Sequence, residues 1–156
     1  MSQPRRKAAD PQLGPLGEIT GYHFRRAWNV LRKDFEASLQ DLGVRQAQIG
    51  ILSVIHANPG INQGVVGKML DIQRANMVAL IGELADVGWV VRGEDPADRR
   101  AIALTLTSAG EKLLSDALRR IDRHEQGLFS VLSESERTML LDMLQRLGDA
   151  RVAGAG

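Results

Sequence analysis

The spacing of apolar residues changes twice along the chain, and this change limits the possible folds more than any other feature. Up to Gly88, apolar residues recur every three or four positions, as they do on one face of a helix. Between 101 and 107 they alternate, with Ile102, Leu104 and Leu106 on one side. After this segment the helical spacing returns. The sequence therefore predicts a mostly α-helical chain that carries one small β-hairpin.

Four helices are predicted before the hairpin. The first spans 18–42 and the second spans 45–57, and a glycine or proline terminator follows each of them. Two shorter helices follow at 62–70 and 73–87, with only a few residues between them. Two helices joined by a tight turn are a candidate helix-turn-helix.

The hairpin pairs a strand at 89–93 with the alternating segment through a charged connection. Ser108 and Glu111 then have the spacing of a capping box, which starts a helix. Ser133 and Glu136 repeat this spacing. One long helix and one final helix are therefore predicted after the hairpin.

Composition excludes several classes of protein. The chain has no Cys, so disulfides, thiolate metal sites, Cys nucleophiles and thiol redox sensors are excluded. Its three His show no metal-ligand spacing, and His124 is predicted to lie at the surface. The segment 60–68 resembles a phosphate loop, but Asn62 stands where glycine is needed and Met69 stands where Ser or Thr is needed. We therefore expect no enzyme, no metal site and no cofactor.

Targeting signals are also missing from the sequence. No stretch approaches the about 18 uncharged apolar residues of a membrane span, and the polar start lacks the apolar centre of a secretory signal. We therefore expect a soluble, cytoplasmic bacterial protein with no membrane partner. Residues 1–16 carry Arg5, Arg6 and Lys7 without periodicity. They are predicted to be a flexible basic tail, which is either inert or touches phosphate.

Charge restricts the kind of nucleic-acid binding that is possible. The formal net charge is +1, and residues 44–107 hold equal numbers of basic and acidic side chains. Aromatic residues make up 4% of the chain, which argues against a stacking platform for single strands. Binding to duplex DNA would therefore depend on where the charges lie and on having two such segments in one complex.

The order of the middle helices and the hairpin is the plan of a winged helix-turn-helix. In this plan the second helix of the pair enters the major groove, so its first turn reads the bases. Gln73 and Asn76 can pair with adenine edges, and Arg74 can pair with a guanine edge. Gln63 and Lys68, on the preceding helix, can position the DNA backbone. The alternative is that these are exposed cap and first-turn residues without a function.

The tip of the hairpin carries Asp98, Arg99 and Arg100. A guanidinium group suits the narrow, electronegative minor groove, and a neighbouring carboxylate can hold it in one orientation before binding. The sequence therefore predicts a DNA contact at the tip, with a solvated turn as the alternative.

Two parts of the chain resemble the MarR family of bacterial winged-helix regulators, and the resemblance covers roughly residues 17–150. The sequence Asp-Pro-Ala-Asp-Arg-Arg-Ala at 95–101, followed by Leu-Thr-Leu-Thr-x-x-Gly at 104–110, is similar to that family's wing and the start of its fifth helix. The segment 84–90 is similar to the exit from its recognition helix. The resemblance implies that Asp98 and Arg100 form the family's wing pair.

The resemblance further implies a homodimer that reads a pseudo-palindrome in double-stranded DNA. Residues 17–43 and 108–152 would form a helical dimerisation region, and 44–107 would form the DNA-binding lobe, with base readers near Arg74, Ala75 and Asn76. Members of the family are usually repressors released by a small, often aromatic or anionic, ligand. The predicted helices outside the lobe carry more apolar residues than one lobe can bury, and a dimer interface would cover them. These residues are Phe24, Leu118, Ile121, Leu140 and Leu144.

The segment 72–77 is similar to members that control aromatic-acid degradation, some of which respond to an acyl-CoA thioester. In such a dimer Tyr22 and Trp28 could form aromatic walls for the effector. An anion could meet His23, Arg26 and, near the end of the second predicted helix, His56. Alternatively, Trp28 belongs to the core and His56 caps a helix C-terminus. The alternative function is a ligand-blind architectural DNA-binding protein or a helical adaptor.

Overall fold

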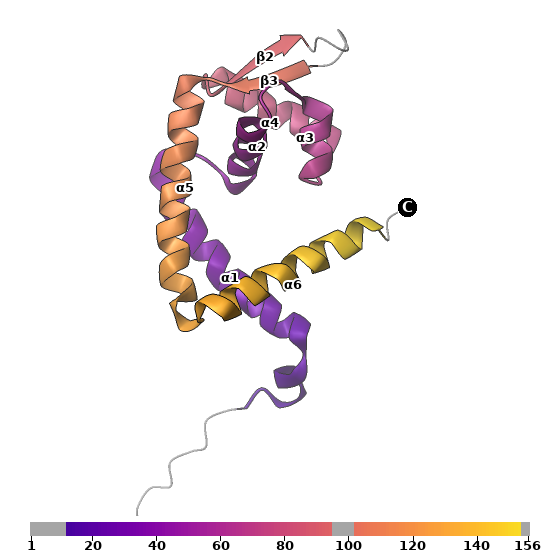
Figure 1. Cartoon of the computed structure of the whole chain (residues 1–156), viewed down its shortest axis with the longest axis vertical. Helices are drawn as coiled ribbons and strands as arrows, with labels where there is room; N and C mark the ends of the chain where they lie inside the picture. The colour runs from indigo at the N-terminus through magenta and orange to yellow at the C-terminus, as the bar shows by residue number, and fades with distance from the viewer. Residues whose placement is uncertain (1–11, 95–101, 154–156) are drawn as a thin grey trace, which may run out of the picture. The chain divides into compact units, whose positions relative to one another are not determined.

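The computed structural model describes residues 12–94 and 102–153 (Figure 1). The chain divides into two compact units, 1–34 and 35–156, and each is described by itself. The first unit contains the 3-10 turn η1 (Gly14–Glu18) and most of helix α1 (Thr20–Leu39).

The second unit contains the last turn of α1 and every later element. η2 (Gln40–Leu42) extends α1, and Gly43 ends it with a left-handed φ of 64°. The elements that follow are α2 (Gln46–Ala57), β1 (Ile61–Asn62), α3 (Gln63–Met69), α4 (Arg74–Asp86), β2 (Val90–Glu94), β3 (Ile102–Leu106), α5 (Ser108–Leu128), η3 (Phe129–Val131) and α6 (Glu134–Ala153). The predicted fold class, mostly helical with a small β wing in a winged helix-turn-helix, is confirmed.

The three strands form one antiparallel sheet in the order β1-β3-β2. β3 pairs with β2 through Val90 opposite Leu106, and with β1 through Ile61 opposite Leu104. The sequence does not predict β1, because a strand of two residues is too short to show alternation. This short strand ties the start of α3 to the hairpin.

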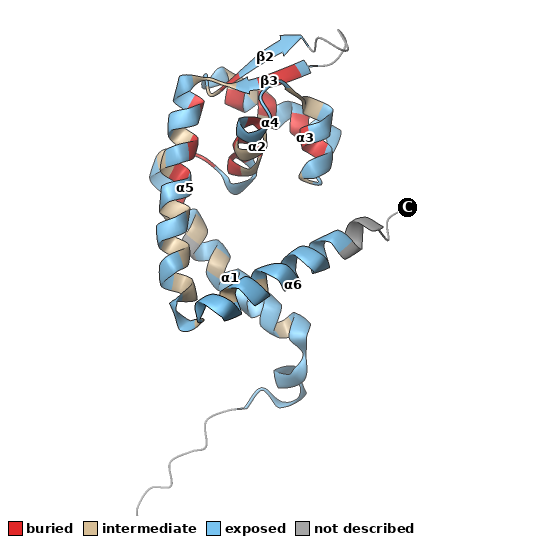
Figure 2. Cartoon of the chain, in the orientation of Figure 1, coloured by how far each residue is buried: buried red, intermediate tan, exposed pale blue. Residues whose placement is uncertain are grey.

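The core lies where α2, α3, α4 and α5 meet the sheet (Figure 2). Leu104, at the centre of β3, is completely buried. The alternation predicted for this strand fails near the hairpin tip, where Ile102 is 39% exposed and Ala103 is buried. The reason is position, because Ala103 pairs with both β1 and β2, whereas Ile102 pairs with β2 alone beside the connection between the two hairpin strands.

The capping box predicted at Ser108 is wrong by one residue. Thr107 caps α5, because its Oγ1 accepts a hydrogen bond from the backbone N–H of Gly110 at 3.0 Å. Glu111 then lies one position too far along the helix to close the box. Its carboxylate instead contacts the ring of His56 on α2, with 2.6 Å between Oε2 and Nδ1.

Gly110 allows α5 to begin directly beside the segment that leads into β2. The hydroxyl of Thr107 donates to the carbonyl oxygen of Gly88 at 2.6 Å, and its backbone N–H donates to that of Trp89 at 3.0 Å. A Cβ at position 110 would collide with the Trp89 carbonyl oxygen. The close approach therefore requires glycine, which gives a physical reason for this glycine after the hairpin.

The capping box at the start of α6 is confirmed. The carboxylate of Glu136 accepts hydrogen bonds from the backbone N–H of Ser133 at 2.8 Å and from its hydroxyl at 2.7 Å. The backbone N–H of Glu136 donates back to Ser133 Oγ at 3.4 Å. The hydrogen bonds from Ser133 lower the pKa of Glu136 below its usual value.

The helices outside the core expose large apolar side chains. On α6, Met139 is 58% and Leu147 is 67% exposed, and α1 exposes Phe24. Figure 2 shows α6 as exposed over nearly all of its described length. Within the described residues, no helix combines the length and the apolar character needed to cross a membrane.

Candidate nucleic-acid interface

The helix-turn-helix begins at a side-chain cap. Asn62 ends β1, and its Oδ1 accepts a hydrogen bond from the backbone N–H of Gly64 at 2.7 Å. The same residue pairs with Ala103 of β3. The start of α3 is therefore fixed to the sheet, and the orientation of α3 follows from the strand before it.

The turn between α3 and α4 depends on a glycine and on one residue with a left-handed backbone. Asp71 adopts a φ of 52°, and the N–H of Ile72 donates to the Gly67 carbonyl at 2.8 Å. A Cβ on Gly67 would lie 3.2 Å from the Ile72 carbonyl oxygen. The absence of a side chain at position 67 therefore lets the turn fold tightly onto α3.

α4 is held by a buried face and a polar brace. Met77, Ile81 and Leu84 are buried in the core, which leaves the opposite face of α4 exposed. Gln48, buried on α2, donates to Glu83 at 3.0 Å, and Arg45 pairs with the same carboxylate. The brace connects the beginning of α2 to the last turn of α4, and together with the buried face it holds α4 in place.

A hollow of about 570 Å³ lies between α3, the turn and the start of α4. Four of the residues predicted to contact DNA line it together: Gln63, Lys68, Gln73 and Arg74. Asn76 is exposed on α4 but is not among the lining residues. Within the described residues, none of these five side chains forms a hydrogen bond or an ion pair.

The hollow is biased toward positive charge although the lobe as a whole is balanced. Lys68 lies in the last turn of α3, and Arg74 is the first residue of α4, whose first turn carries no carboxylate. The unpaired N–H groups at the start of α4 add partial positive charge. Asp71 is the one acid among the lining residues. The arrangement suits a polyanion, and its polar side chains suit base edges.

The wing is described up to its tip. β2 and β3 form its two strands, and Asp98, Arg99 and Arg100 lie outside the described residues. Sequence reasoning misses two side chains on these strands. Ile102 lines the hollow, and Arg92 lies against α4, where a Cβ on Gly82 would come within 3.5 Å of its Nη2. Neither belongs to a motif, so only the tertiary structure places them.

Four of the predicted effector residues lie on α1, in the first unit. The rings of Tyr22 and His23 pack edge to face with centroids 5.5 Å apart, and His23 Nε2 lies 2.8 Å from the Gly17 carbonyl oxygen. Arg26 is exposed. The side chain of Trp28 is 43% exposed in the single chain. The alternative that Trp28 belongs to the core of its own chain is therefore wrong.

The remaining histidines lie in the second unit. The ring of His56 contacts the carboxylate of Glu111 on α5, as described above. Its partner is therefore a side chain of another helix and not the C-terminus of α2, which the helix-cap alternative requires. The prediction that His124 is a surface residue is wrong in part, because its Nε2 is buried and has no hydrogen-bond partner among the described residues.

Comparison with known proteins decides the family. The model of the MarR family matches residues 42–101, which span the helix-turn-helix and the wing. The chain is also 31% identical over 154 residues to the putative transcriptional regulatory protein for the hcr operon of Thauera aromatica, and the match covers 94% of this chain and 92% of that protein. The chain belongs to the MarR family. The resemblance drawn from the wing and the recognition helix is thereby confirmed.

Solved structures of one MarR-family relative agree with this assignment. The transcriptional repressor CouR, bound to a 23-mer DNA duplex, matches with a TM-score of 0.83 and 34% identity over 90% of this chain and 99% of that one. CouR bound to p-coumaroyl-CoA matches with a TM-score of 0.76 and 33% identity over 88% and 96%. This MarR-family chain is a transcriptional regulator with a DNA-binding winged helix.

Proposed function

We propose that this MarR-family protein is a homodimeric repressor that binds a pseudo-palindromic operator and is released by a small effector. The observation that carries the proposal is the hollow between α3 and α4, because it gathers four unbonded polar side chains beside the positive start of α4. A binding surface in the free protein is expected to present such unpaired groups at positions that a rigid core fixes.

The side chains divide into readers and positioning contacts. Arg74 pairs with a guanine, and Gln73 and Asn76 pair with adenines, in the major groove. Lys68 and Gln63 contact phosphates at the edge of that groove. In the wing, the arginines at 99 and 100 enter the minor groove, oriented by Asp98.

A second copy of the chain covers the exposed apolar surfaces of α1 and α6. Phe24 and Trp28 on α1, and Met139 and Leu147 on α6, are all more than two-fifths exposed in one chain. Large exposed apolar patches mark interaction surfaces. A dimer also supplies the second reading helix, which a lobe with balanced charge needs for tight binding.

The effector is an aromatic acid or an acyl-CoA thioester. Tyr22 and Trp28 supply the aromatic contacts, and His23 and Arg26 on the same helix meet an anionic group of the effector. The complex of the related CouR with p-coumaroyl-CoA supports this class of ligand. Binding releases the operator only if the effector prefers the dimer in which the two reading helices have the wrong separation.

Selection of operator sequences and measurement of the protein's mass in solution test the proposal together. Selection from random duplexes should yield two half-sites about 10 bp apart, centre to centre, and sedimentation should give the mass of two chains. Half-sites without a fixed spacing, or a single chain at micromolar concentration, would contradict it. Operator binding that no aromatic acid or acyl-CoA changes would favour the ligand-blind architectural protein instead.

A further inference from the structure

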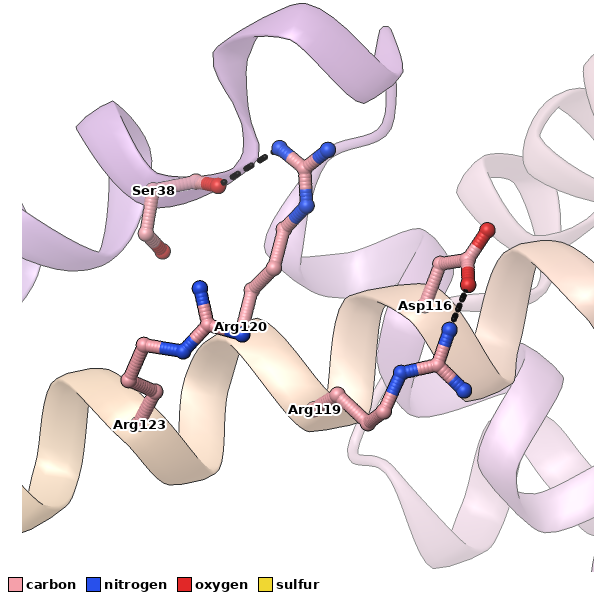
Figure 3. A pocket seen from close by; sticks show the side chains of 5 residues that line it. All are labelled: Ser38, Asp116, Arg119, Arg120 and Arg123. Carbon is pink, nitrogen blue, oxygen red and sulfur yellow. Dashed lines mark hydrogen bonds and ion pairs between the residues drawn. The ribbon is translucent and has the colours of Figure 1, made fainter.

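A second hollow, of about 560 Å³, lies beside the middle of α5 and is lined by Ser38, Asp116, Arg119, Arg120 and Arg123 (Figure 3). It belongs wholly to the second unit. Three arginines from neighbouring turns of one helix line this hollow, with one carboxylate among the lining residues. None of the residues proposed to contact DNA or the aromatic part of an effector lines it.

Two of the three arginines are already oriented by carboxylates. Arg120 pairs with Asp41 of η2 and also donates to the Ser38 carbonyl oxygen at 3.4 Å. Its hydrogen bond lowers the pKa of Asp41, so both groups stay charged. Arg119 pairs with Asp116 and donates to the hydroxyl of Ser115 at 3.0 Å.

Arg123 is the arginine without a partner. It forms no hydrogen bond or ion pair within the described residues. Figure 3 shows its guanidinium group between Ser38 and Arg120. Counting Asp41, the cluster carries one more positive than negative charge. The like charges on one helix face repel each other, and an anion bound among them would relieve this repulsion.

The lining also indicates which anion fits. It contains no aromatic or large apolar side chain, so it does not suit the ring of an aromatic acid. A guanidinium group binds phosphate through paired N–H donors in a fixed fork. The guanidinium groups of the three arginines point in different directions, so one phosphate group cannot meet all of them. A single carboxylate would leave most of the hollow empty. The chemistry therefore favours a molecule that carries more than one phosphate group.

We propose that the cluster of Arg119, Arg120 and Arg123 binds the phosphate groups of a nucleotide-containing small molecule, such as the CoA part of a thioester effector. This inference rests on the proposed effector-controlled function and selects one effector class within it. Arg123 supplies the free fork, and the two paired arginines hold the rest of the site in shape.

Calorimetric titration of the full-length protein tests the site. Coenzyme A and inorganic pyrophosphate should bind, with an affinity that falls as salt rises, and pantetheine, which lacks phosphate, should not bind. Arg123→Gln should weaken binding of coenzyme A about tenfold. Arg123→Lys should lose less, because it keeps the charge but not the fork.

Arg146→Gln is the matched control, because Arg146 lies on α6 and pairs with Asp142 of its own helix. It removes the same charge and should leave the binding of coenzyme A unchanged. Equal losses in both variants, tight binding of pantetheine, or no binding of coenzyme A to the wild-type protein would each overturn the proposal.

Operator binding separates this proposal from the proposed function. Arg123→Gln should bind operator DNA as the wild-type protein does, and a loss of operator affinity in this variant would show that the cluster contacts DNA instead. If the wild-type protein binds an operator and an aromatic acid without phosphate releases it, while coenzyme A does not bind, this inference fails alone. If the wild-type protein binds no operator, the proposed function fails whatever coenzyme A does.

Discussion

The winged lobe and the long terminal helix are both rich in apolar residues, but they bury them very differently. α2 buries Ile49, Ile51, Leu52 and Ile55 against the rest of the lobe. α6 leaves almost all of its described side chains exposed. The lobe therefore takes its stability from contacts within one chain, whereas α6 leaves its apolar side chains available for contact with another molecule.

The largest effect is expected inside the lobe. Leu104→Ala removes a completely buried side chain at the centre of the sheet and should lower the free energy of unfolding by about 2–5 kcal/mol. Urea unfolding measures this loss. Leu147→Ala, on exposed α6, should leave the stability of the single chain unchanged at concentrations below those at which it dimerises. A similar loss there would contradict the difference between the lobe and α6.

Gly110→Ala tests the close contact between α5 and the segment before β2. The new Cβ would collide with the Trp89 carbonyl, so the free energy of unfolding should fall by about 1–3 kcal/mol. Gly127→Ala is a control on the same helix, where a Cβ meets nothing within 4 Å, and it should be neutral or stabilising. Equal stability of the two variants would show that α5 can shift without cost.

DNA binding distinguishes two residues of the hollow. Arg74→Ala should cost about 1–3 kcal/mol of operator binding and relax the preference at one base pair. Lys68→Ala should weaken binding to all sequences alike and reduce the salt dependence by about one charge. Mobility shifts with operator variants measure both effects. Loss of base preference in the Lys68 variant would reverse the assigned roles.

Dimerisation should depend on the apolar side chains of α6 and not on the hollow between α3 and α4. Leu147→Ala removes an exposed apolar side chain and should weaken dimerisation by about 1–2 kcal/mol, without changing the unfolding of the single chain. Sedimentation over a dilution series measures the dissociation constant. Gln145→Ala, on the same helix, should leave it unchanged, and a dimer insensitive to Leu147 would place the interface elsewhere.

The smallest effect concerns the start of α6 and depends on pH. The pKa of Glu136 is lower in the folded protein than its ordinary value of 4.5, because Ser133 donates two hydrogen bonds to the charged form. The stabilisation is therefore present above the unfolded pKa and is lost as pH falls through the folded pKa. At pH 7 the urea midpoint of unfolding should be higher for the wild-type protein than for Glu136→Gln. The difference between the two midpoints should disappear in acid. A gap that widens in acid would contradict this cap.

The local features of the fold could be predicted from the sequence. The change of hydrophobic period locates the hairpin, and the glycines and the capping box of Ser133 and Glu136 locate helix ends within a few residues. Competing local signals could not be resolved this way. Ser108 and Thr107 are neighbours with the same chemistry, and only the hydrogen bond from Thr107 to the Gly88 carbonyl favours one of them.

The site could be predicted in its members but not in its arrangement. Gln63, Lys68, Gln73 and Arg74 follow from the plan of a helix-turn-helix, yet the hollow that joins them depends on the close turn at Gly67. The wing tip at 95–101 and the division into a DNA-binding lobe and a dimerisation region stay predictions.

The amino-acid sequence alone was enough to give the order of the helices and of the two hairpin strands, the resemblance to the MarR family, and the residue types available to meet DNA. These depend on spacing and turn chemistry, which are interactions between near neighbours in the chain. The folded structure was needed to show which apolar helices are buried, why position 110 must be glycine, and that three arginines of α5 share one hollow with the end of α1. Those properties arise from contacts between residues far apart in sequence, and no local pattern records them.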